Sequence, residues 1–100
     1  MDLERIKLEK AMEGLEEFQS DFIKDRQAEL AKVDPTDLLE LSQLSHKWKG
    51  FAAPYGFHYL EKIALEIDVA CKAKNLVDCK KSLDELSEYL EMKKDIINNG

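Results

Sequence analysis

Residues that break helices are scarce in this chain. Only four glycines and two prolines occur in 100 residues, and no long stretch alternates apolar and polar residues with the period of two that is typical of strands. Apolar residues instead recur at steps of three and four, which places them on one face of an α-helix. The sequence therefore predicts an all-α fold.

Four helical segments are predicted, at about residues 11–32, 35–53, 57–74 and 76–97. We expect the core to be formed by four apolar stripes: Leu15, Phe18, Phe22 and Leu30 in the first segment, Leu38, Leu41, Leu44, Trp48, Phe51 and Ala52 in the second, Leu60, Ile63, Ala64, Ile67 and Ala70 in the third, and Leu76, Cys79, Leu83, Leu86 and Leu90 in the fourth. Residues 2–13 are expected either to form a short extra helix or to extend the first, with Gly14 as a break.

Turn-forming residues mark both ends of the second segment. Asp34 is a favourable N-cap, Pro35 suits the first helical position, and Asp37 complements the helix dipole. Pro54 lacks a backbone donor and disfavours the helical conformation before it, so it should end this helix. Short connections make successive helices antiparallel neighbours, so we predict an up-down-up-down four-helix bundle.

Size and charge narrow the class of protein. One hundred residues, 44% of them hydrophobic, suffice for a single domain with its own core, spanning residues 1–100. The formal charge of −6 and the lack of a basic tract argue against nucleic-acid binding. No apolar run approaches the roughly 20 residues that span a bilayer, and the N-terminus lacks a signal-peptide pattern. We expect a cytoplasmic protein without membrane association.

Cys71 and Cys79 do not form a metal-binding pattern. Their separation differs from the close pairs of zinc sites, and no histidine cluster accompanies them. Each occupies an apolar helical position, which favours buried, reduced thiols and leaves a disulfide between them open. No metal site is predicted.

His46 lies on the side of the second helix opposite its apolar stripe. At about 100° per residue it falls about 190° from the centre of that stripe, so it should face solvent. Gly50 follows one turn later, although a mid-helix glycine costs roughly 1 kcal/mol relative to alanine. We infer that this glycine clears space beside the imidazole ring.

The surface around His46 is small and partly apolar, as expected where another molecule approaches closely. Lys49, three residues on, is placed to neutralise a group that the ring nitrogen accepts, most naturally a phosphoryl. We expect the partner to contact Leu39, Ser42, Gln43, Lys47 and Ala53. On physical grounds alone, an ordinary surface histidine beside a lysine is an equally good interpretation.

A motif favours the chemical interpretation. His46, Lys49, Gly50 and Gly56 match the pattern H-x-x-K-G-x-x-x-x-x-G of histidine-containing phosphotransfer (HPt) domains. The resemblance extends over roughly residues 15 to 95, including the aspartate-containing turn before the histidine helix and the glycine turn after it. The chain resembles a stand-alone HPt domain.

The resemblance implies a phosphorelay intermediate rather than an enzyme, without autokinase activity. His46 would accept a phosphoryl group from a receiver-domain aspartate and pass it to another receiver, with Lys49 stabilising the phosphate and Gly50 giving access. Gly56 would turn the chain into the next helix. The implied partners are response-regulator receiver domains and a hybrid sensor kinase. The receiver would supply Mg²⁺, so no cofactor of the chain itself is expected, and we expect a monomer.

Two other positions bear on this assignment. Asp68 stands where an uncharged polar residue would suit a phosphate better, and Lys72, one turn later, is a weaker candidate that would partly offset it. His58 is a poor phosphoacceptor, because it falls in the first turn of a helix, where the dipole disfavours positive charge, and lacks a lysine–glycine pair after it.

Two alternative functions remain open at this stage. One is a helical docking module that binds a receiver or a kinase without carrying phosphate. The other is the dimerisation domain of a sensor kinase, but an acidic residue should then follow the histidine, and a proline soon after, where Lys47 and Gly50 stand.

Overall fold

Five helices make up most of the computed structural model, which describes residues 2–99. They are α1 (Leu3–Lys7), α2 (Gln19–Lys32), α3 (Leu38–Ala52), α4 (His58–Lys72) and α5 (Leu76–Asn99), and a 3₁₀ turn at Glu16–Phe18 leads directly into α2. Within residues 2–99 there is no strand. The predicted all-α fold is confirmed, and α1 is the short extra helix.

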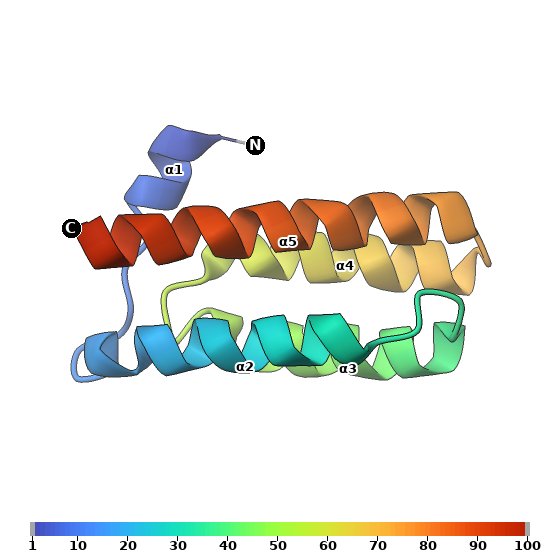
Figure 1. The fold of residues 1–100 in the computed structure, drawn as a ribbon, viewed down its shortest axis with the longest axis horizontal. Helices are drawn as coiled ribbons and strands as arrows, with labels where there is room; N and C mark the ends of the chain where they lie inside the picture. Colours follow the sequence, from blue (N-terminus) through green and yellow to red (C-terminus); the bar gives the residue numbers. More distant parts are fainter. Residues whose placement is uncertain (1, 100) are drawn as a thin grey trace.

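The four longer helices lie side by side along the long axis of the molecule, and α1 lies on the outer side of α5 (Figure 1). The most extensive packing is between α3 and α4, followed by α4 against α5 and α2 against α5. Because α4 is in contact with both α3 and α5, its buried stripe forms the centre of the core. This stripe was predicted correctly: Leu60, Ile63, Ala64, Ile67 and Ala70 are all buried.

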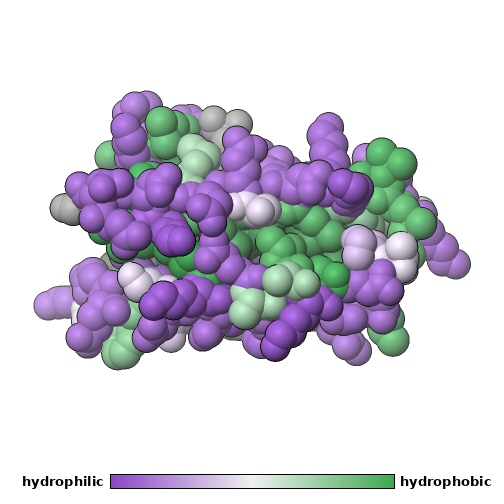
Figure 2. Space-filling view, viewed as in Figure 1, coloured by the Kyte–Doolittle hydropathy of each residue, from purple (hydrophilic) through white to green (hydrophobic). Residues whose placement is uncertain are grey.

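Aromatic side chains close the core between α2 and the α3–α4 turn. The Phe22 ring stacks on Phe57 with 4.4 Å between centroids and meets Phe51 edge-on at 5.6 Å. Trp48 and Tyr89 are fully buried. Figure 2 shows the outcome on one face, where hydrophilic residues cover the helices and hydrophobic side chains follow the seam between α5 and α2.

Seven residues of the predicted stripes lie outside the core or at its edge. Phe18 is 45% exposed because it belongs to the turn before α2, and Leu76 is 48% exposed because it is the first residue of α5. Five others are half-buried rather than buried: Leu15, Leu30, Leu38, Leu44 and Phe51. Of the half-buried residues, Leu30, Leu38, Leu44 and Phe51 still pack against the core.

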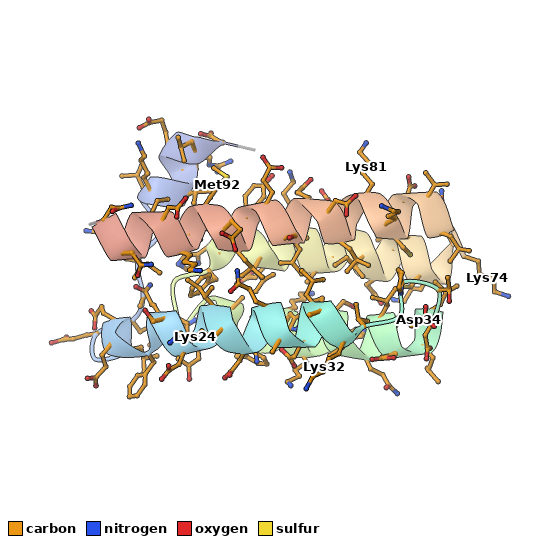
Figure 3. The ribbon with its side chains drawn as sticks, in the orientation of Figure 1. Lys24, Lys32, Asp34, Lys74, Lys81 and Met92 are labelled. Atoms are coloured by element: carbon orange, nitrogen blue, oxygen red, sulfur yellow. The ribbon has the colours of Figure 1, made fainter. Side chains whose placement is uncertain are left out.

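The helix containing His46 starts later than predicted. Asp37, not Asp34, is its N-cap, and the Asp37 Oδ1 accepts from the backbone N–H of Glu40 at 3.1 Å. Asp34 instead caps its own turn, accepting from the backbone N–H of Thr36 at 2.9 Å and from its hydroxyl at 2.6 Å. Figure 3 shows Asp34 in this turn between α2 and α3. Pro35 therefore lies in the turn, outside the helix.

The first predicted helix is also shorter, because residues 8–15 form an irregular segment rather than a helix. This segment passes over the turn between α3 and α4, where the Met12 N–H donates to the Pro54 carbonyl at 2.8 Å. Gly14 has a φ of +88°, as suits the predicted break.

Glu9 anchors this segment in the molecule. Its Oε1 accepts from the Tyr89 hydroxyl at 2.7 Å and lies 3.2 Å from Nζ of Lys93, which is 2% exposed. Its Oε2 accepts from the backbone N–H of Tyr59, in the first turn of α4, at 2.6 Å. Burial lowers the pKa of Lys93, and the Glu9 carboxylate partly offsets that shift. One carboxylate thus links the N-terminal segment to α4 and α5.

Candidate functional site

His46 lies near the middle of α3, with 65% of its side chain exposed. The opposite side of the helix is buried: Leu41 and Trp48 are fully covered, and the Ser45 hydroxyl donates to the Ser42 carbonyl at 2.8 Å. The prediction that His46 faces solvent while Trp48 packs beneath it is confirmed. The ring is therefore reachable by another protein. Packing in the core does not explain why a histidine stands at this position.

A carboxylate from α4 faces the histidine. The Asp68 Oδ1 lies 3.5 Å from the His46 Nε2 and accepts from the Ser42 hydroxyl at 3.1 Å. Nζ of Lys72 lies 2.9 Å from the other carboxylate oxygen, Oδ2. These contacts lower the pKa of Asp68, mainly through the hydrogen bond from Lys72 and against the opposing effect of burial. The group next to the ring is thus an ionised carboxylate with a lysine attached to its far oxygen.

Lys47 points to a different partner, on α2. Its Nζ lies 2.6 Å from the Glu29 Oε2, while the other oxygen of Glu29 accepts from the Trp48 indole N–H at 3.2 Å and pairs with Arg26. Burial raises the pKa of Glu29, but the hydrogen bonds from Lys47, Trp48 and Arg26 outweigh it and the pKa is lowered. Lys47 thus holds α3 against α2.

Lys49 and Gly50 lie on the same exposed side of α3 as His46. Within residues 2–99 no carboxylate pairs with the ammonium of Lys49. A Cβ built on Gly50 would meet no atom within 4 Å, so the space beside the ring is open. The two lysines therefore differ in their contacts, since Lys47 forms an ion pair with α2 and Lys49 forms none within residues 2–99.

The remaining predicted partner residues are distributed around His46 as expected for one helix face. Leu39 is 70% exposed and Gln43 is exposed, whereas Ser42 and Ala53 are half-buried. Lys72 is connected to the site by its ion pair with Asp68. Of the set, Lys47 and Ser42 also make contacts within the molecule: Lys47 pairs with Glu29, and the Ser42 hydroxyl donates to Asp68.

Sequence analysis missed two exposed apolar residues on α4. Leu65 is 51% exposed and Val69 is 59% exposed, and both lie within one turn of Asp68. They line one side of a shallow groove between α4 and α5. Their positions outside the buried stripe of α4 were a usable signal, because a solvated face would carry charged residues there.

His58 lies apart from this surface, at the start of α4, where its Nε2 is 3.4 Å from the Lys10 carbonyl. Cys71 and Cys79 are buried with their sulfurs 3.9 Å apart and not bonded. No cluster of three histidine, cysteine or carboxylate side chains that could hold a metal ion is found between residues 2 and 99. No helix in that range is long and apolar enough to cross a membrane.

Comparison of the chain with protein-family models, with curated proteins and with solved structures gave no match. The candidate site thus rests on the chemistry and geometry of the residues themselves.

Proposed function

We propose that the chain is a histidine phosphotransfer protein, in which His46 accepts a phosphoryl group from the aspartate of a receiver domain and passes it to another receiver. The observation that carries this proposal is the combination on α3 of an exposed imidazole, the open space at Gly50 and a lysine three residues away whose ammonium pairs with no carboxylate within residues 2–99. A nucleophile needs this access, and the developing negative charge needs this cation.

The proposed architecture is an antiparallel up-down-up-down four-helix bundle formed by α2 to α5, with α1 as an addition. Its support is the short turns on either side of α4 and the packing of α4 between α3 and α5. In such a bundle the histidine helix keeps one face for the core and one for a partner.

The partner surface proposed for a receiver consists of Leu39, Gln43, Gly50 and Ala53 from α3, extended by Leu65 and Val69 from α4. Leu39, Leu65 and Val69 are exposed and Ala53 is half-buried, and exposed apolar residues are typical of a docking surface. Any Mg²⁺ would arrive with the receiver. The proposed setting is a cytoplasmic phosphorelay in which the chain acts as a monomer.

Incubation with a panel of acetyl-phosphate-charged receiver domains tests this function. The expected result is a phosphorylated chain whose phosphate is stable to alkali and labile to acid, as for phosphohistidine. Replacement of His46 by Gln should abolish the signal, while His58→Gln should leave it intact. Labelling that survives His46→Gln would refute the assignment.

A docking module without phosphotransfer is the second candidate. The exposed Leu39, Leu65 and Val69 favour this function as much as they favour phosphotransfer. The two functions separate in one experiment. If receivers bind both wild type and His46→Gln with similar affinity but never label the wild type, the docking function is correct.

A further inference from the structure

The contact between Asp68 and His46 places a negative charge where a phosphoryl group would be attached. The Asp68 Oδ1 lies 3.5 Å from Nε2, the outer nitrogen of an exposed ring. Asp68 itself is 8% exposed and is held on two sides, by the Ser42 hydroxyl at 3.1 Å and by Lys72 at 2.9 Å. A carboxylate fixed in this way cannot swing away at no cost when the ring changes charge.

Phosphorylation would change the charge opposite this carboxylate. The lone pair of Nε2 attacks the phosphorus of the acyl phosphate, the bond from phosphorus to the acyl oxygen breaks, and the receiver carboxylate leaves with that electron pair. The tautomer that reacts carries its proton on Nδ1, and once Nε2 is phosphorylated that proton is released to water, so the ring bears a phosphoryl dianion at Nε2. Two like charges this close repel each other, and the repulsion grows as water is excluded.

We propose that Asp68 raises the phosphoryl-transfer potential of His46, so that the phosphohistidine passes its group on rather than storing it. This inference rests on His46 being the phosphoacceptor. Asp68 acts through charge, as a tuning residue that neither gains nor loses the phosphoryl group. It favours the unphosphorylated ring, whether neutral or protonated, over the phosphorylated one.

Lys72 sets the size of this effect. Its ammonium binds the carboxylate oxygen on the far side from the ring, so it partly neutralises Asp68 without coming between Asp68 and Nε2 in the resting state. Removing Lys72 should expose the full charge of Asp68 to the phosphoryl group. Asp68→Asn and Lys72→Met should therefore shift the phosphorylation equilibrium in opposite directions.

The test uses phosphoramidate, which phosphorylates histidine without any receiver. The ratio of phosphorylated to free His46 is measured by ³¹P NMR at equilibrium with fixed phosphoramidate and ammonia. We expect Asp68→Asn to raise that ratio about fivefold to tenfold and Lys72→Met to lower it. Glu66→Gln is the matched control, because it removes one carboxylate of α4 that pairs with Lys62 at 3.8 Å instead of facing His46; it should change the ratio less than twofold.

Salt provides a second readout that a purely structural role of Asp68 would not move. The difference between wild type and Asp68→Asn should shrink as ionic strength rises, because a charge effect at an exposed site is screened. A ratio for Asp68→Asn that is equal to or below that of wild type at low ionic strength overturns the proposal. Failure of all receivers to label wild type, together with the expected phosphoramidate result, would instead refute the proposed relay function alone.

Discussion

Gly56 and Ala11 lie so close that a Cβ on Gly56 would be 2.5 Å from the Ala11 backbone nitrogen. The φ of Gly56 is +85°, a conformation that L side chains rarely adopt. Its carbonyl also accepts from the buried Nζ of Lys93 at 3.0 Å. Gly56 therefore does more than turn the chain from α3 into α4, because the N-terminal segment crosses over its bare backbone.

This relationship predicts unequal effects of alanine at two glycines with similar backbone angles. Gly56→Ala should cost about 3 kcal/mol or more of unfolding free energy, since strain in φ adds to a clash with backbone that cannot move aside. Gly14→Ala should cost about 1 to 2 kcal/mol, because its φ is +88° but nothing lies within 4 Å of the added Cβ. Urea denaturation of both variants measures the difference, and equal losses would contradict the close approach.

Glu9 should be the most destabilising carboxylate to neutralise in the N-terminal segment. Glu9→Gln leaves the buried ammonium of Lys93 without its counter-charge, which typically costs about 3 kcal/mol or more. Glu13→Gln, on an exposed residue of the same segment, should stay within about 0.5 kcal/mol of wild type. Thermal unfolding gives both values. The double variant Glu9→Met/Lys93→Met should recover part of the loss; if it does not, the ion pair is not what Glu9 provides.

The contrast between α4 and the N-terminal region shows what the sequence could predict. The buried stripe of α4 and the exposed position of His46 follow from a repeat of 3.6 residues, which depends on neither partners nor loops. Glu9 was not identified because its role depends on Tyr89 and Lys93, some eighty residues away in sequence. The start of α3 was misplaced because Asp34 and Asp37 are both good caps, and the side chain of Asp34 is occupied by Thr36.

The pair formed by His46 and Asp68 could be predicted only in part from the sequence. Sequence analysis marked both residues and the offsetting Lys72, but the facing geometry requires the packing of α3 on α4. The pairing of Lys47 with Glu29 depended in the same way on the position of α2, and no local pattern indicated it.

Cys71 should react slowly with alkylating reagents in the folded chain. Burial raises its pKa to about 11, with the neighbouring Cys79 adding to the shift, so very little thiolate exists near pH 8. Because the folded pKa lies above the ordinary value, the thiol form stabilises the fold, and this contribution is lost as pH rises through the folded pKa. Iodoacetamide labelling between pH 7 and 9, compared with labelling in denaturant, tests this. Rapid labelling of native protein at pH 7 would show that the thiol is accessible and ionised.

Gly50→Gln should block phosphotransfer and leave the fold intact. The glycine is exposed and its missing Cβ faces open space, so a helix-forming residue should raise stability by up to about 1 kcal/mol. The longer side chain, one turn from His46, would fill the space that a partner needs. Circular dichroism and transfer from a charged receiver are measured together, and a variant that unfolds would show that Gly50 serves packing rather than access.

Lys49 and Lys47 provide the sharpest comparison, because the structure assigns them different roles on one helix. Lys49→Ala should lower the rate of phosphotransfer with little change in stability, since its ammonium is available to a phosphoryl on His46 and, in the docked complex, partial exclusion of water strengthens that interaction. Lys47→Ala should do the reverse. It removes an ion pair of 2.6 Å to Glu29 and should cost about 0.5 to 1 kcal/mol of stability with little effect on the rate.

Single-turnover transfer from one phosphorylated receiver, combined with urea denaturation of each variant, separates these roles. Equal rates for the two variants would show that the positive charge on α3 acts only as general attraction for an acidic partner. A loss of stability in Lys49→Ala matching that of Lys47→Ala would show that both lysines serve the packing of α3, and His46 would then lack the cation on which its proposed chemistry depends.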